Sequence, residues 1–288
     1  MKQNETIENS NKKITKKGIV KFDPDTAKTL PITTGRKRTS GYFVSKKYNN
    51  LTIEIKAFES LNGYDLITFF QMLDDYQKNP DKWEYNTSFQ LKDENERIVK
   101  KRIFKLKNLC KQRQILNKKP NRISIAKSFK RWYQAELIYN YHKENNILET
   151  RYIYEYMVSN DNYDELIIIA NCSFLDFCLE NGMAMNWERL VKYGKNYYGL
   201  ELDIYLQFRS IQYGKKTKKY KYPDVIKEQT LFHHIGLNND VKDIKHKREK
   251  LKLAFKKFEE ITGIKYILQK DEFNEYKWVK SYSQFIEK

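Results

Sequence analysis

The chain has 288 residues, of which 40% are hydrophobic and 15% aromatic, and a formal net charge of +18. That length fits one large or two ordinary domains, and the apolar content excludes wholesale disorder. No run of 18 apolar residues is present, and the first residues contain no apolar signal segment. We therefore expect a soluble, cytoplasmic protein with no membrane-spanning or secretory segment. Cys110, Cys172 and Cys178 are too few and too irregularly spaced for a disulfide framework or a zinc site.

The positive charge is concentrated in blocks along the chain. Lysine outnumbers arginine 44 to 11, which an AT-rich genome produces by itself, but such a surplus should be spread evenly. Instead, residues 97–135 carry 14 basic and no acidic residues, whereas residues 51–96 and 136–205 have net charges of −6 and −7. Segregated positive blocks on a chain that folds indicate a polyanionic partner, and nucleic acid fits better than a membrane surface.

Residues 1–41 are expected to form a flexible basic arm. The segment is polar and lysine-rich, and its end at 33–41 is basic and bounded by glycine. Such arms follow phosphates or lie in the minor groove, although a solubilising tail has the same composition.

The first folded domain is expected over residues 42–172. Alternating apolar residues predict a strand at Leu51–Ile55. A helix is predicted to begin after Asn62-Gly63 and to end at Asn79-Pro80.

Two further helices of this domain are expected to carry its positive charge. The first is predicted at about 94–115, with an apolar stripe opposite a lysine stripe, and the second at about 123–143. Which of them contacts DNA is left open by the sequence. The candidate DNA-contact residues on these two helices are Lys100, Lys101, Lys105, Lys127, Lys130 and Arg131. Aromatic and β-branched runs at 150–159 and 163–171 then predict a hairpin.

The second domain is expected over residues 173–288, with a helical segment at 187–193 near its start. A helix at about 200–213 is followed by a basic loop at 215–222. The next helix is predicted to start at Pro223, or alternatively at Lys227 if Tyr220–Tyr222 form a short strand, and to end at Gly236.

A long helix over about 241–262, ended by Gly263, completes the helical part of this domain. Strands at 264–269 and 276–282 are then expected to form a hairpin. Helix, helix, turn, long helix and hairpin is the order of a winged helix.

In a winged helix, the helix after the turn enters the major groove and its N-terminal half contacts DNA. Arg248 has the planar fork that best recognises guanine, whereas lysines bind phosphates as point charges. A solvated lysine-rich helix face is the alternative interpretation. The candidate contact residues are Lys242, Lys245, Lys247, Arg248 and Lys250 on the long helix and Lys215, Lys216, Lys218, Lys219 and Lys221 in the basic loop.

Signatures of enzymes are weak. Gly214-Lys215-Lys216-Thr217 resembles the end of a phosphate-binding loop, but position 209 is Arg where that loop needs glycine. His233 and His234 are adjacent on a predicted helix, so they point about 100° apart and cannot easily share a metal ion. No catalytic residue, metal or cofactor is therefore expected.

The last 140 residues resemble the winged-helix replication initiators (Rep proteins) of iteron-containing plasmids. The similarity lies in the hairpin at 152–170, the segment Gly199–Arg209, then Leu231–Leu237, and Lys252–Phe258 before the terminal hairpin. The resemblance implies an α+β, mainly helical fold with two tandem winged-helix domains. The basic helix at 123–143 departs from the family's pattern.

The resemblance also implies a function. Such proteins bind repeated duplex DNA at a plasmid origin, help to open it, recruit the host initiator and helicase, and often dimerise through the first domain. A winged-helix transcriptional repressor is the first alternative, because it needs the same DNA contacts. A DNA nickase or recombinase that uses a tyrosine is the second.

Overall fold

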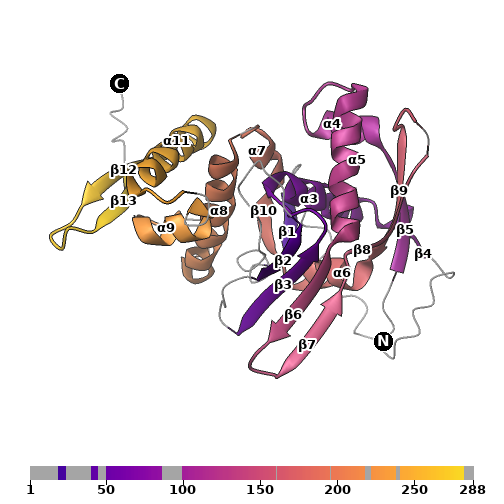
Figure 1. The fold of residues 1–288 in the computed structure, drawn as a ribbon, viewed down its shortest axis with the longest axis horizontal. Coiled ribbons are helices and arrows are strands. Elements are labelled where there is room, and N and C mark those ends of the chain that lie inside the picture. The colour runs from indigo at the N-terminus through magenta and orange to yellow at the C-terminus, as the bar shows by residue number, and fades with distance from the viewer. Residues whose placement is uncertain are drawn as a thin grey trace.

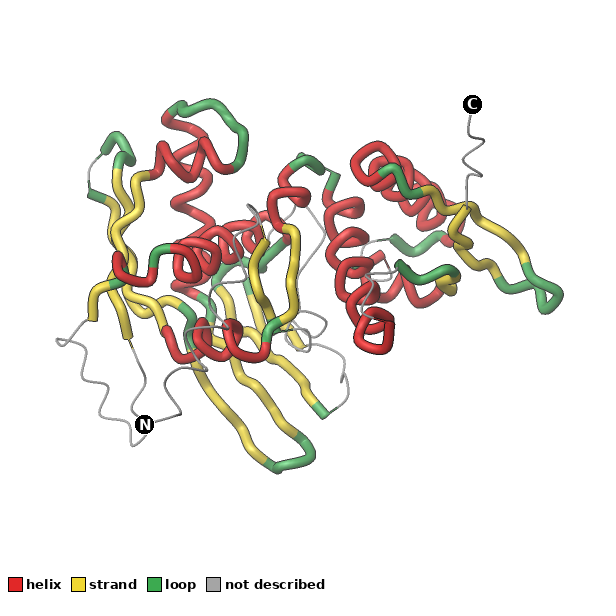
Figure 2. The backbone as a smooth tube through the Cα atoms, turned by 180° about the vertical axis from the view of Figure 1, so that it is seen from behind, coloured by secondary structure: helices red, strands yellow, loops and turns green. Residues whose placement is uncertain are grey.

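The computed structural model describes residues 19–23, 40–44, 50–85, 99–159, 161–194, 196–217, 222–237 and 241–281. These residues form a mixed α/β protein with two groups of elements, and α8 (Tyr197–Thr217) is the part of the second group that faces the first, as Figures 1 and 2 show from opposite sides. In the described ranges, no helix combines the length and the apolar character that crossing a membrane requires.

Among the described residues, the first group contains two antiparallel four-stranded sheets, three α-helices and the short 3-10 helix η1. One sheet has the order β2-β3-β6-β7, and the other has the order β4-β5-β9-β8. The elements are β2 (Gly41–Val44), β3 (Leu51–Ala57), α3 (Gly63–Lys78), η1 (Pro80–Lys82), β4 (Glu84–Tyr85), β5 (Val99–Lys105), α4 (Leu106–Gln112), α5 (Lys119–Gln134), β6 (Glu136–Tyr141), β7 (Asn146–Thr150), β8 (Ile153–Val158) and β9 (Glu165–Asn171).

The predicted strand at Leu51–Ile55 and the helix after Asn62-Gly63 are confirmed by β3 and α3. Asn62 starts α3 because its Oδ1 accepts hydrogen bonds from the Tyr64 and Asp65 amides. The Asp65 carboxylate accepts in return from the Asn62 amide, which completes a capping box.

The helix expected at 94–115 is wrong over its first half. Residues 99–105 are strand β5, which pairs with β9 from Val99↔Asn171 to Lys105↔Glu165. Only 106–112 is helical, as α4. The pattern of apolar and basic residues fits a helix. All seven residues of this segment pair with β9, however, and a partner that distant in sequence cannot be recognised from the local pattern.

The helix expected at 123–143 is displaced and too long. It is α5, which starts at Lys119 with Pro120 in its first turn, a position that proline favours. It ends at Gln134, and residues 136–141 form β6 between β3 and β7. These two corrections replace the mainly helical fold with a mixed one.

The basic arm expected at 1–41 contains a core strand. β1 (Ile19–Phe22) pairs with β10 (Met183–Asn186), and Val20 and Phe22 are fully buried. Gln77 holds β1 from α3, because its side-chain amide bonds both the amide and the carbonyl of Lys21. The rest of the arm lies outside the described residues, apart from 23, 40 and 41.

β1 and β10 belong to a connecting layer between the two groups. This layer also includes α6 (Cys172–Asn181) and α7 (Trp187–Val191). The hairpin predicted at 150–171 is confirmed as β8 and β9, and the helical segment predicted at 187–193 is confirmed as α7.

The second group comprises α8 and the elements after it. They are β11 (Val225–Lys227), α9 (Glu228–His234), α11 (Ile244–Thr262), β12 (Lys265–Lys270) and β13 (Tyr276–Ser281), with the sheet order β11-β13-β12. The long helix and the hairpin are confirmed, and Gly263 ends α11 in the left-handed conformation at φ 72°. The later helix start is correct, because Lys227 is the N-cap of α9, but the short strand before it is β11 at Val225–Lys227 and was expected at 220–222.

The two groups repeat one order of elements. The first unit, which we define as residues 63–171, runs α3, β5, α4, α5, β8, β9, with η1 and β4 inserted after α3 and the hairpin β6–β7 inserted after α5. The second unit, residues 197–281, runs α8, β11, α9, α11, β12, β13. The sheet orders β5-β9-β8 and β11-β13-β12 correspond strand by strand. α5 and α11 therefore occupy equivalent places, as third helix before a hairpin.

Because β1 is buried, Phe22 should contribute far more to the stability of the fold than the exposed Phe58. Phe22 is fully buried against the rings of Phe69, Phe70 and Phe208, whereas Phe58 is 70% exposed. Phe22→Ala should lower the free energy of unfolding by about 3–5 kcal/mol, and Phe58→Ala by less than about 0.5 kcal/mol. Urea unfolding followed by circular dichroism measures both. Equal effects would show that β1 is not part of the core.

The crossing of α3 and α8 predicts a pH dependence of stability. Glu201 on α8 lies against Gly63, where Leu200 also packs, and the Glu201 Oε1 atom is buried with no hydrogen-bond partner among the described residues. Burial raises the pKa of Glu201 from 4.5 to about 8. The folded chain therefore holds a proton that the unfolded chain releases, and the free energy of unfolding should fall as pH rises from about 4.5 to 8. Glu201→Gln should reduce that slope in urea unfolding at several pH values, whereas Glu144→Gln, at an exposed turn, should leave it unchanged.

Candidate nucleic-acid interface

Helix α5 presents a basic, polar face to solvent. Its sequence contains no acidic residue, and its apolar side, with Ile125, Phe129 and Trp132, is buried. Lys127 and Lys130 are exposed, as the sequence predicts. The structure adds Lys119 and Ser124 to this exposed face. Pro120 could have shown that the helix includes Lys119, because proline marks a first turn.

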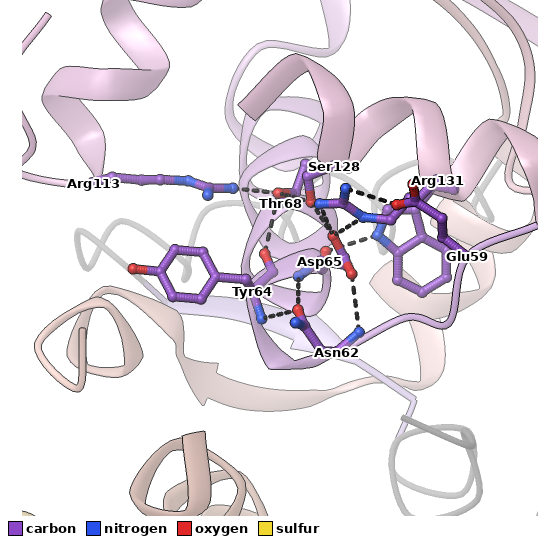
Figure 3. A network of polar contacts seen from close by, with 9 residues as sticks. Glu59, Asn62, Tyr64, Asp65, Thr68, Arg113, Ser128 and Arg131 are labelled. Atoms are coloured by element: carbon purple, nitrogen blue, oxygen red, sulfur yellow. Dashed lines mark hydrogen bonds and ion pairs between the residues drawn. The ribbon is translucent and has the colours of Figure 1, made fainter. Parts of the chain in front are cut away.

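A buried carboxylate fixes α5 on α3. Asp65 is fully buried, and its Oδ1 accepts from Ser128 Oγ at 2.6 Å and from Arg131 Nε at 2.9 Å. Trp132 Nε1 donates to the Asp65 carbonyl at 2.7 Å. Figure 3 shows Ser128 and Arg131 of α5 pointing toward Asp65. A buried carboxylate is stable only when it is paired and hydrogen-bonded, so these contacts hold α5 at one position.

The same network continues to the end of α4. The buried Arg113 guanidinium donates to Gln71 Oε1 at 2.6 Å and to Thr68 Oγ1, and Thr68 also bonds Ser128. Burial lowers the pKa of Arg113 to about 10. Both helices of this part of the first unit are thus anchored on α3 by polar contacts.

Arg131 faces inward, although it is one of the residues predicted to contact DNA. Besides Asp65, its guanidinium pairs with Glu59 at 3.3 Å, and only 11% of its side chain is exposed. Its donors are therefore used inside the fold, because an arginine on this side of α5 lies within reach of two carboxylates.

The lysines predicted near 100 lie on a strand and on different faces of it. Lys100 lies over the Tyr76 and Tyr85 rings on the side of Phe104, which packs against Phe129 of α5. Lys101 and Lys105 alternate with Lys100 and so project from the other face of the sheet. The structure does not bring Lys101 and Lys105 together with the exposed face of α5.

In the second unit, α11 carries the exposed Lys245 and Lys250, and Lys242 is exposed just before it. Asp243 caps the helix by accepting from the Lys245 amide. Lys247 is partly buried, with its ammonium 5.8 Å from the Phe232 ring. A groove beside the helix, between α11 and β12, adds Lys252, Lys256 and Lys265 to the basic surface, and none of the three was among the predicted contact residues.

Arg248 is occupied by contacts within the unit. Its Nε and Nη2 atoms donate to the two carboxylate oxygens of Glu228 at 2.9 and 2.7 Å, and the Glu228 side chain is only 3% exposed. The Arg248 guanidinium also lies 3.8 Å from the centre of the Tyr276 ring. Arg248 thus joins α11 to α9 and β13, and its guanidinium binds Glu228, although a guanine was the predicted partner.

The predicted basic loop is partly helical. Lys215 and Lys216 belong to α8, which continues to Thr217, while Lys218, Lys219 and Lys221 lie outside the described residues. The segment that resembles a phosphate-binding loop is therefore also in α8. His234 stacks on Tyr205, and no group of three His, Cys, Asp or Glu in the described ranges is placed to hold a metal ion.

Comparison with known proteins gives a likeness in structure alone. No protein-family model matches the chain, and no curated protein matches its sequence. Two crystal structures of domains 2 and 3 of RctB are similar to it. A selenomethionine derivative has a TM-score of 0.57 at 13% identity and covers 90% of this chain and 98% of its own. The other has a TM-score of 0.50 at 14% identity and covers 87% and 95%. At these identities the likeness shows a shared fold.

Because Arg248 pairs with the buried Glu228, replacing Arg248 should destabilise the fold, whereas replacing an exposed lysine on the same helix should not. Arg248→Ala leaves the Glu228 carboxylate buried without its partner, which should lower the free energy of unfolding by about 3–5 kcal/mol. Lys245→Ala, on the same helix and exposed, should change it by less than about 0.5 kcal/mol. Urea unfolding measures both variants. A stable Arg248→Ala variant would mean that Arg248 is not needed inside the fold.

Proposed function

We propose that the chain is a replication initiation protein that binds duplex DNA through two winged-helix units, residues 63–171 and 197–281. The repeated order of elements carries this proposal, because each unit has the helix, strand, two helices and hairpin of a winged helix in the matching sheet order. RctB, whose domains 2 and 3 have a similar fold, is a replication initiator.

The two third helices, α5 and α11, are the proposed DNA-contacting elements. In winged helices the third helix enters the major groove. α5 has no acidic residue and exposes Lys127 and Lys130, and α11 exposes Lys245 and Lys250 in its first two turns. Lysines neutralise phosphates, so these positions account for affinity, whereas Ser124 can hydrogen-bond a base edge.

Arg248 and Arg131 do not contact DNA in this proposal. Each is held by a buried carboxylate, so we assign them the role of fixing α11 and α5 in place. The phosphate contacts are assigned to the lysines that have no such partner role in the fold.

The finer parts of the proposal follow the resemblance to plasmid initiators. The DNA is repeated origin DNA (iterons), and the two units of one chain contact successive segments of the major groove, about 34–36 Å apart. Bound protein promotes opening of the origin and recruits the host initiator and helicase. Self-association through the first unit completes the proposal, and no catalytic group takes part.

A transcriptional repressor would make the same DNA contacts, so a functional assay separates the two. A plasmid that carries only this gene and its flanking repeats should replicate in a suitable host if the chain is an initiator. Failure to replicate, with repeat binding intact, would favour a repressor.

Replacing a contact lysine should change how binding depends on salt. Lys127→Ala or Lys245→Ala should weaken binding to all duplexes alike and lower the slope of log affinity against log salt by about 1, because one phosphate contact is lost. Fluorescence anisotropy with the gene's flanking repeats, over a range of salt concentrations, measures this.

Lys82→Ala is the matched control. Lys82 is exposed on η1, within the acidic block at residues 51–96. Its replacement should leave both the affinity for DNA and the salt slope unchanged. Equal slopes for all three variants would contradict the assignment of α5 and α11.

A further inference from the structure

The groove between α11 and β12 lies where a helix face meets the edge of a sheet. α11 and the hairpin β12–β13 lie side by side at the end of the molecule away from the first group, as Figures 1 and 2 show. The groove has a volume of about 280 Å³, and its apolar lining includes Phe255, Leu268 and Trp278. Phe255 stacks on Trp278 with ring centres 4.1 Å apart, so this lining belongs to the packed core of the second unit.

The strand that lines this groove, β12, is an edge strand. Among the described residues it pairs with β13 alone, in the sheet order β11-β13-β12. The Asp271 amide donates to the Glu275 carbonyl, and the same register continues through Ile267↔Val279. Alternate residues of an antiparallel strand direct their backbone groups to opposite sides, so those of Leu268 are directed to the open edge. An extended segment can therefore add to β12 as a further strand.

Lysines line the groove from both sides. Lys252 and Lys256 belong to α11 and Lys265 belongs to β12, and all three are exposed. Glu259, about one helical turn after Lys256, brings a negative charge to the lining. The groove is thus positively charged overall, with its positive charge on both walls and its apolar surface between them.

We propose that this groove binds an extended acidic segment of a partner protein, which adds to the open edge of β12 beside α11. The backbone of the segment pairs with β12. An apolar side chain at its centre packs on Phe255 and Leu268, and its carboxylates pair with Lys252 and Lys256. This occupant satisfies both features of the groove, because an open strand edge pairs with a peptide backbone and the lysines attract negative charge.

DNA and a second copy of the chain fit the groove less well. DNA has no peptide backbone for the strand edge, and Glu259 and the apolar lining disfavour it. Antiparallel pairing of β12 with β12 of a second copy in full register sets Lys265 opposite Lys270, and like charges there are unfavourable. The proposed DNA contacts Lys245 and Lys250 precede the groove on α11. The inference therefore goes beyond the proposed function, and its test uses protein without DNA.

The probe is a fluorescein-labelled peptide of about ten residues, with aspartates and glutamates on both sides of a central pair of leucines. Fluorescence anisotropy with the full chain should show saturable binding. Lys252→Glu and Lys256→Glu should each raise the dissociation constant at least about tenfold, and Glu259→Lys should lower it, because each changes the charge that faces the peptide. Lys257→Glu is the control, since Lys257 is on the same helix outside the groove, where it pairs with Glu260.

Methylated peptides test strand addition separately from charge. Methylation of alternate backbone nitrogens should abolish binding when the methylated set faces β12 and should spare it when the set faces away. A peptide with lysine in place of every acidic residue should not bind. Thermal unfolding of each protein variant shows whether its fold is intact.

Three results would overturn the inference: no saturable binding, equal binding of the acidic and basic peptides, or equal effects of the two methylated sets. Anisotropy with duplex DNA gives a fourth. Lys252→Glu and Lys256→Glu should weaken DNA binding no more than Lys257→Glu does, and a larger loss would make the groove part of the DNA-contact surface. A chain that binds the peptide but no duplex would instead contradict the proposed function alone.

Discussion

The buried carboxylate of Asp65 is the constraint on which the first unit depends. It completes the cap of α3 and accepts hydrogen bonds from Ser128 and Arg131 of α5. A charge removed from water must find partners, so α5 cannot move on α3 without leaving Asp65 unpaired. The exposed face of α5 is thereby held in one orientation, which is what a rigid ligand such as duplex DNA requires.

In the second unit a different pair of residues holds the third helix in place. Glu228, at the start of α9, is buried, and its two carboxylate oxygens accept hydrogen bonds from Nε and Nη2 of Arg248. The Arg248 guanidinium also lies over the Tyr276 ring. In both units an arginine on the third helix pairs with a buried carboxylate. Both arginines pair with carboxylates inside the fold, so the exposed positive charge of these helices comes from lysines. Affinity from lysines depends strongly on salt, because phosphates are neutralised as point charges.

Much of the C-terminal half could be predicted from local signals. Asp243 and Gly263 cap α11 at both ends, and both strands of the hairpin after it contain aromatic and β-branched residues. The N-terminal half was harder because its partners are distant in sequence. Residues 99–105 have a helical pattern, yet they pair with β9, about 65 residues later. β1 appeared to be part of a polar arm, although Phe22 fills a space between α3 and α8.

Three features could be predicted from neighbouring residues alone. They are the division of charge into blocks, the ends of the capped helices and the terminal helix–helix–hairpin order. Which charges face outward depends instead on long-range packing. Arg248 and Lys245 are three residues apart on one helix, and nothing local distinguishes their availability. The difference arises because folding brings Glu228 to Arg248 and leaves Lys245 in water. A side chain's role in binding depends on the partner that folding supplies, and that partner is set by long-range packing.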